Sequence, residues 1–189
     1  MNPLTQYIRS QVSSLSEEAV DMLEHAFRIK EKKKGDILLH QGDTCKDLYF
    51  LSEGITRSYS IRDGLDITTW FGFKNDFVTA FASFFPKEPS YESIEMLTDG
   101  VLYQISYHQL LEIQNQSREI ERAINYFSLL YTVQLEKRLF VIQTHSAKEK
   151  YKLILQQEPH LIQRIPNKHL ASYLGITRET LSRIRSSIN

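Results

Sequence analysis

The chain has 189 residues, of which 41% are hydrophobic and 24% are charged, and its formal net charge is zero. This balance is typical of a globular protein and excludes a largely disordered chain. Its one cysteine, Cys45, excludes an internal disulfide and a cysteine-rich metal site, and its six histidines lack the spacing of metal ligands. We therefore expect no metal. Because no stretch reads as a signal peptide or a membrane span, we expect a soluble, cytoplasmic protein without a membrane partner.

Charge is divided unevenly along the chain. Residues 1–110 carry 11 Lys and Arg against 16 Asp and Glu, a net charge of −5, whereas residues 111–189 carry 12 against 7, a net charge of +5. A neutral chain gives no reason to expect a nucleic-acid partner. The basic excess of the C-terminal part, however, has the sign that contact with phosphates requires.

The first elements are predicted to be helical and the next ones extended. Apolar residues recur at helical spacing over residues 3–30, where Ser16 is a cap for a second helix. From residue 29 to 105, short runs rich in β-branched and aromatic residues alternate with Gly and Asp turns, and Asp63-Gly64 is a tight hairpin signal. We expect strands in 36–39, 48–51, 56–61 and 67–71. The pattern predicts an α+β protein with an N-terminal jelly-roll-like β-roll.

Beyond residue 106 the helical period returns. A short helix is predicted at 107–113 and a long one at 118–143, which contains neither Pro nor Gly. Apolar residues of the long helix cover more than one face, so it needs burial on two sides. The same helix of a second subunit is the economical partner, which predicts a homodimer, although burial within one domain is the alternative. The expected dimer contacts are Ile120, Ile124, Phe127, Tyr131 and Leu135.

The chain is thereby divided into a β-roll sensor domain at 1–116, a dimerisation helix at 117–144 and an all-α domain at 145–189. In the last part Ser146 is expected to cap a helix that runs to Gln157 and is ended by Glu158-Pro159.

Residues 165–188 have the pattern of a helix-turn-helix. Pro166 suits the first turn of a helix, and Gly175 stands where a helix needs a left-handed residue at its end. Thr177 is placed to cap the next helix. The predicted buried stripes are Leu170, Ala171 and Leu174 on the first helix, and Leu181, Ile184 and Ile188 on the second.

The opposite face of the second helix carries groups that can recognise base edges. Arginine bonds bidentately to guanine, and glutamate accepts from the amino group of cytosine. We expect base contacts from Arg178, Glu179, Ser182 and Arg183 and phosphate contacts from Lys168, Thr177 and Arg185, on double-stranded DNA. The alternative is a surface helical hairpin with ordinary solvated charges.

Two sets of residues form a recognisable combination: Lys34-Gly35-Asp36, Gln41-Gly42-Asp43 and residues 48–54 in the β-roll, and residues 174–184 in the helix-turn-helix. Through them the whole chain resembles the Crp/Fnr family of bacterial transcription regulators. The resemblance implies a homodimer that binds an inverted-repeat operator and contacts bases through Arg178, Glu179 and Arg183. RNA polymerase is a further candidate partner. The family often adds a β-hairpin wing after the reading helix, and because the sequence closes at Asn189 we expect the wing to be missing.

In the sensory half the sequence departs from the pattern of cyclic-AMP binders. The Gly-Glu that serves the ribose aligns with Asn75-Asp76, the Arg-Ser or Arg-Thr pair for the phosphate aligns with Ser90-Tyr91, and the Thr-Ser pair for adenine aligns with Leu135-Glu136. Without a guanidinium for the phosphate, we expect no tight binding of cyclic AMP and no cofactor. The candidate effector pocket either takes another ligand or is filled by its own side chains; its residues are Phe73, Asn75, Asp76, Phe77, Ser90, Tyr91, Tyr131 and Leu135.

Two other functions are alternatives to a DNA-binding regulator. The first is a small-molecule or protein-interaction sensor whose helix-turn-helix has no DNA-binding activity. The second is a cupin-type enzyme, which the absence of paired histidine ligands disfavours. Because the sequence offers no nucleophile with a matching base and no Gly-rich phosphate loop, we expect no catalytic residues.

Overall fold

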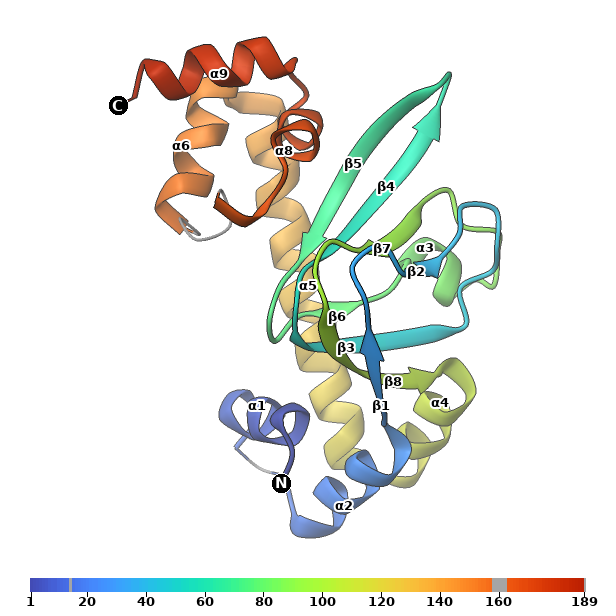
Figure 1. Ribbon diagram of the computed structural model, residues 1–189. Helices are drawn as coiled ribbons and strands as arrows, with labels where there is room; N and C mark the ends of the chain where they lie inside the picture. Colours follow the sequence, from blue (N-terminus) through green and yellow to red (C-terminus); the bar gives the residue numbers. More distant parts are fainter. Residues whose placement is uncertain (14, 158–162, 189) are drawn as a thin grey trace. The chain divides into compact units, whose positions relative to one another are not determined.

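The computed structural model describes residues 1–13, 15–157 and 163–188 (Figure 1). The predicted helix stop at Glu158-Pro159 and the terminal Asn189 lie outside the described residues. Two compact units are present: Met1–Ser58 with Phe71–Leu130, and Tyr59–Trp70 with Tyr131–Asn189. Helices end at Gln116 and Thr144, where the sequence predicted boundaries, but the two units divide the chain after residues 58, 70 and 130, so the three-part division stays a prediction.

The first unit begins with two helices and a strand. Helix α1 spans Pro3–Gln11 and α2 spans Glu17–Ala26; the side chain of Ser16 caps α2 by accepting from the N–H of Ala19 at 3.2 Å. The prediction of helix up to residue 30 was wrong beyond Ala26. Phe27 is extended, and β1 (Arg28–Lys32) pairs antiparallel with β8, because hydrogen bonding to that neighbour outweighs the local helical pattern.

The strands form two four-stranded sheets, with the orders β1-β8-β3-β6 and β2-β7-β4-β5. The remaining bounds are β2 Ile37–Leu39, β3 Asp47–Glu53, β4 Thr56–Arg62, β5 Leu65–Gly72, β6 Phe77–Val78, β7 Ser93–Met96 and β8 Gly100–Ser106, with a short helix α3 at Phe81–Phe84. The predicted strands and α+β class are confirmed. Asp63 and Gly64 both have positive φ, 51° and 75°, as a two-residue hairpin turn of the mirror type requires.

Aromatic side chains fill the core of the first unit. The ring of Phe50 lies 5.3 Å from that of Phe77, which in turn lies 5.0 Å from the ring of Phe127 on the long helix. Helix α4 (Tyr107–Gln116) starts at a capping box between Ser106 and Gln109. The next helix, α5, runs from Arg118 to Thr144, as the sequence predicted.

The two ends of α5 have different surroundings. Near its start, Ile120 is 1% exposed and belongs to the core of the first unit, with Ile124 and Phe127 packed against it. Ile120 therefore has no surface left for a dimer contact, in contrast to its predicted role. Further along, the helix exposes a run of large apolar side chains: Leu129, Val133, Leu135, Leu139, Phe140 and Ile142.

The second unit contains helices α6 (Ala147–Gln157), α8 (Asn167–Leu174) and α9 (Arg178–Ser186), which are grouped together in Figure 1. Ser146 caps α6 as predicted, accepting from the N–H of Glu149 at 3.3 Å. Tyr151, Leu170 and Leu181 are buried among these helices. Over the described residues, no helix is both long and apolar enough to cross a membrane.

Candidate nucleic-acid interface

The turn between α8 and α9 has the geometry that the sequence predicted. Gly175 adopts φ 70° and ψ 34°, and the N–H of Ile176 donates to the carbonyl of Ala171 at 3.0 Å, which closes α8. The hydroxyl of Thr177 then accepts from the N–H of Thr180 at 3.2 Å and opens α9. Pro166 lies one residue earlier than expected: it precedes the helix as its N-cap, and α8 begins at Asn167.

Helix α9 has one buried and one exposed face. Leu181 and Ile184 are buried, whereas Ile188, predicted to extend the stripe, lies beyond the end of the helix and is only half-buried. The four predicted base-reading residues are all exposed, and they are Arg178, Glu179, Ser182 and Arg183. The apolar face anchors α9, so the polar face is presented as a rigid surface.

Two of the exposed side chains form hydrogen bonds near the start of α9. The Nη2 of Arg183 donates to the hydroxyl of Thr180 at 3.1 Å, which directs the guanidinium toward the N-terminal turn. Hydrogen bonds from its own backbone N–H and from the Thr177 hydroxyl lower the pKa of Glu179, so this carboxylate is ionised at neutral pH. The first turn of α9 thus holds a hydrogen-bond acceptor beside two guanidinium donors.

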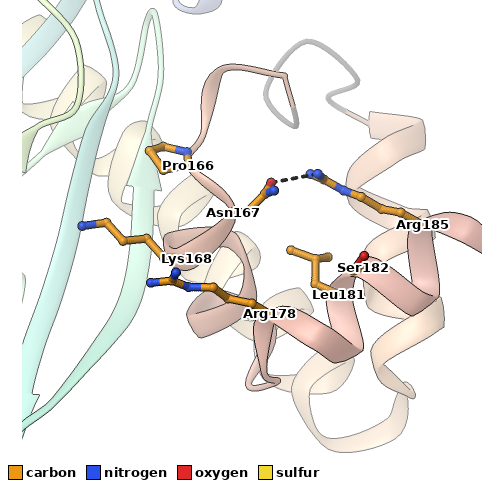
Figure 2. Close-up of a pocket in the computed structure, with 7 residues that line it drawn as sticks. All are labelled: Pro166, Asn167, Lys168, Arg178, Leu181, Ser182 and Arg185. Carbon is orange, nitrogen blue, oxygen red and sulfur yellow. Dashed lines mark hydrogen bonds between the residues drawn. The ribbon is translucent and has the colours of Figure 1, made fainter.

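A hollow of about 390 Å³ lies between the start of α8 and α9 (Figure 2). Its lining residues are Pro166, Asn167, Lys168, Arg178, Leu181, Ser182 and Arg185. Three of these carry a positive charge and none is acidic, and Figure 2 shows the side chains of Lys168 and Arg178 extending to the same side. A phosphate group is the natural complement of such a surface, since the N-terminal end of a helix adds further positive potential.

Arg185 has a different place from that expected of a phosphate contact. Its Nη1 donates to Oδ1 of Asn167 at 2.8 Å, and its guanidinium lies 5.8 Å from the ring centre of Tyr151 on α6. The group therefore ties α9 to the first turn of α8 (Figure 2). Its Nε and Nη2 are buried and have no acceptor among the described residues.

Sequence reasoning missed the roles of two residues of this site. Thr180 was given no part in orienting Arg183, although its place three residues before Arg183 makes it a neighbour on the helix surface. Asn167 was also missed, because its partner Arg185 is 18 residues away along the chain. No local pattern indicates that pairing.

The residues predicted to form the effector pocket are divided between the two units. Tyr131 and Leu135 lie in the second unit and the other six in the first. In the first unit, the carboxylate of Asp76 accepts from the N–H of Phe73 at 2.8 Å and closes the turn through Asn75, whose φ is 73°. The structure therefore assigns Asp76 a role in shaping this loop.

The other predicted pocket residues have varied surroundings. Ser90 is buried, and its hydroxyl donates to the carbonyl of Glu92 at 2.7 Å. Phe77 belongs to the aromatic core described above, and Tyr91 is 57% exposed. Ser90 and Phe77 thus have structural partners of their own.

A buried arginine in the β-roll was also missed by sequence reasoning. Arg57 on β4 is 2% exposed, and its Nε donates to Oε1 of Glu95 on β7 at 2.7 Å. This guanidinium is neutralised by a carboxylate of the same unit. In the described ranges, no group of three or more His, Cys, Asp or Glu side chains is arranged to hold a metal ion.

The chain is similar to a known domain family in sequence and to solved structures in fold. Residues 29–117 match the cyclic nucleotide-binding domain family. No curated protein sequence matches the chain. Among solved structures, FixK2 from Bradyrhizobium japonicum superposes with a TM-score of 0.74 at 16% identity, over 86% of this chain and 84% of that one.

Two further solved structures are similar to this chain in fold. The c-di-GMP-responsive global regulator CLP from Xanthomonas campestris gives a TM-score of 0.72 at 15% identity, over 92% of this chain and 91% of its own. A protein from Eubacterium rectale, assigned to the crp/fnr family of transcriptional regulators, gives 0.70 at 21% identity, over 91% and 82%. Residues 29–117 are therefore similar to cyclic nucleotide-binding domains, and the chain as a whole shares the fold of these solved structures.

Proposed function

We propose that the protein is a homodimeric, sequence-specific DNA-binding regulator of transcription. The observation that carries the proposal is the exposed face of α9, where Arg178, Glu179 and Arg183 stand over the buried Leu181 and Ile184. A reading helix needs this division, because its apolar face fixes the helix while its polar N-terminal part meets base edges in the major groove. The fold shared with the global regulator CLP supports the same role.

Base and phosphate contacts are assigned by position. Arg178 and Arg183 offer planar donors that match guanine, and Glu179 offers an acceptor for cytosine. Lys168 lines the hollow and Thr177 caps the start of α9, and both would contact the phosphate backbone there. Ser182 lies on the exposed face between these groups.

Random-sequence duplexes offered to the purified full-length chain, followed by sequencing of the retained DNA, test the proposal. We expect enrichment of an inverted repeat. On that duplex, Arg183→Ala should cost about 1–3 kcal/mol and relax the choice of base at one position of each half-site. Lys168→Ala is the matched control: it should weaken all sequences alike and lower the salt dependence of log K by about one charge.

The second half of α5 is proposed as the dimer interface. Leu129, Val133 and Phe140 are 67%, 44% and 60% exposed, and their spacing places them on one face of the helix. Apolar side chains repeated along one helix are those that a parallel helix pair buries. Ile124, Phe127, Tyr131 and Leu135, which the sequence predicted as dimer contacts, remain candidates.

A charge placed in this apolar surface should separate the subunits. Phe140→Glu is expected to shift the protein from dimer to monomer in light scattering coupled to size exclusion. Gln134→Glu, an exposed substitution away from this face of the same helix, should leave the dimer intact. A Phe140→Glu protein that remains dimeric would rule out this interface.

We also propose that the β-roll does not bind cyclic AMP tightly. Its buried guanidinium, Arg57, is already paired with Glu95, and the hydroxyl of Ser90 is bonded to the Glu92 carbonyl. A cyclic phosphate entering here would lack a free charged donor. Calorimetric titration with cyclic AMP should give no saturable heat; tight stoichiometric binding would contradict the proposal.

A sensor without DNA-binding activity is the alternative. An Arg178→Ala/Glu179→Ala/Arg183→Ala triple variant distinguishes the two. Loss of sequence preference supports the regulator, whereas DNA binding unchanged from wild type favours the sensor.

A further inference from the structure

One serine joins helix α8 to strand β5 within the second unit. The Ser172 hydroxyl donates to the carbonyl of Asp66 at 2.9 Å and accepts from the N–H of Thr68 at 2.9 Å. A single side chain on α8 thereby bonds two backbone groups of β5, as a neighbouring strand would. Along the chain, Ser172 is 104 positions from Thr68 and 106 positions from Asp66.

An arginine of the long helix reinforces the same junction. The Nη2 of Arg138 donates to the carbonyl of Thr69 on β5 at 2.8 Å. Its guanidinium also lies 3.9 Å from the ring centre of Tyr173 on α8 and 5.3 Å from that of Trp70 on β5. The planar guanidinium suits this arrangement, because it stacks on aromatic faces while donating in its own plane.

The contacts converge on two short stretches. Ser172 and Tyr173 are adjacent on α8, and Thr68, Thr69 and Trp70 are consecutive on β5. All of these residues and Arg138 belong to the second unit. The contacts of Ser172 and Tyr173 fix α8 with respect to β5 and α5, and those of Arg138 with Thr69 and Trp70 fix β5 with respect to α5. Together they restrain the rotation of α8 as well as its distance.

We propose that Thr68, Thr69, Trp70, Arg138, Ser172 and Tyr173 form a brace that sets the orientation of the DNA-reading helices relative to α5. The proposal rests on the proposed function and adds positioning residues to it. Because α8 is joined to α9 by the Gly175 turn, and Leu170 on α8 and Leu181 on α9 are both buried, an α8 held by the brace also holds the reading helix.

The docked hairpin supports reading and does not block it. Arg178, Glu179 and Arg183 remain exposed while β5 is bonded to Ser172. In a dimer formed through α5, the angle between α5 and α9 determines the separation of the two reading helices. That separation must match half-sites about 34 Å apart, so a loosened brace should weaken simultaneous engagement of both half-sites.

Trp70 reports docking without any DNA, because it is the single tryptophan of the chain. Ser172→Ala removes the hydroxyl and leaves the surroundings of the indole in place. We expect acrylamide to quench Trp70 fluorescence more strongly in Ser172→Ala than in wild type, with the overall helix content unchanged. Arg62→Lys, an exposed substitution near the hairpin turn, is the control and should match wild type. Equal quenching in Ser172→Ala and wild type would overturn the docking.

DNA binding then tests the brace as a positioning device. On the selected inverted repeat, Ser172→Ala and Arg138→Lys should each weaken binding by about fivefold, the loss of one hydrogen bond or stacked contact. On a duplex with a single half-site both variants should bind like wild type. Insertion of one base pair between the half-sites should weaken wild type more than the variants.

The contrary outcomes are distinct. Tighter binding of the inverted repeat by the variants would mean that the hairpin restrains the reader, and equal weakening on both duplexes would mean general damage to α8; either overturns the brace. If wild type shows no sequence preference, the proposed function fails, while the fluorescence comparison still decides whether the hairpin is docked.

Discussion

Replacement of Gly175 by alanine isolates the conformational cost of the turn that joins α8 to α9. The residue has φ 70°, and a Cβ built on it would meet no atom within 4 Å. Steric overlap therefore contributes nothing, and the penalty is that of a left-handed alanine, about 1–2 kcal/mol. In a chain of this size about 1 kcal/mol corresponds to roughly 2–4 °C in Tm.

Thermal unfolding followed by far-UV circular dichroism, with hydrogen exchange at the amides of Ile176 and Leu181, measures the effect locally. These amides donate to Ala171 and Thr177 at 3.0 Å and protect the two sides of the turn. Gly175→Asn should recover part of the loss, because asparagine visits the left-handed region at lower cost. If Gly175→Asn proves as costly as Gly175→Ala, or if alanine is neutral, backbone conformation is not what this glycine supplies.

Two further predictions concern the β-roll. Glu95→Leu should destabilise the protein by about 3–5 kcal/mol in urea unfolding, because the buried Arg57 loses the carboxylate paired with it. The double variant Arg57→Met/Glu95→Leu should recover most of that loss, and an absence of recovery would contradict the pairing. Hydrogen bonds from the backbone of Lys34 and the side chain of Lys33 lower the pKa of Asp99. The ionised carboxylate therefore contributes to the stability of the fold above its unfolded pKa of about 3.9, and this contribution is lost as pH falls through the lower folded pKa. The difference in Tm between wild type and Asp99→Asn should therefore be constant from neutral pH to about pH 5 and narrow below about pH 4; a gap that widens on acidification would refute this.

The parts of the fold that the sequence revealed are those with local causes. Gly175 and Thr177 mark the turn because a left-handed residue and a helix cap each have few suitable side chains. Asp63-Gly64 marks its hairpin for the same reason. The exposed polar face of α9 followed from the spacing of Leu181 and Ile184 alone.

The parts that could not be predicted depend on contacts between distant residues. Ile120 looked like one of several interchangeable apolar positions, since helical period does not indicate which core receives a side chain. Arg57 gave no sign of burial, because its partner Glu95 stands 38 residues away on another strand. The role of Ser172 was likewise not indicated by the sequence, because its hydrogen bonds to β5 form only when the β4–β5 hairpin and α8 lie together in the fold.

The central claim is that the exposed face of α9 selects a DNA sequence. Its most direct test is the ratio of affinities of the full-length protein for the selected inverted repeat and for a scrambled duplex of equal length and composition, at one fixed salt concentration. We predict a ratio of about 10³ or more, as specific binding requires. A ratio near one, with binding to both duplexes falling alike as salt increases, would show that the basic C-terminal helices attract DNA without reading it.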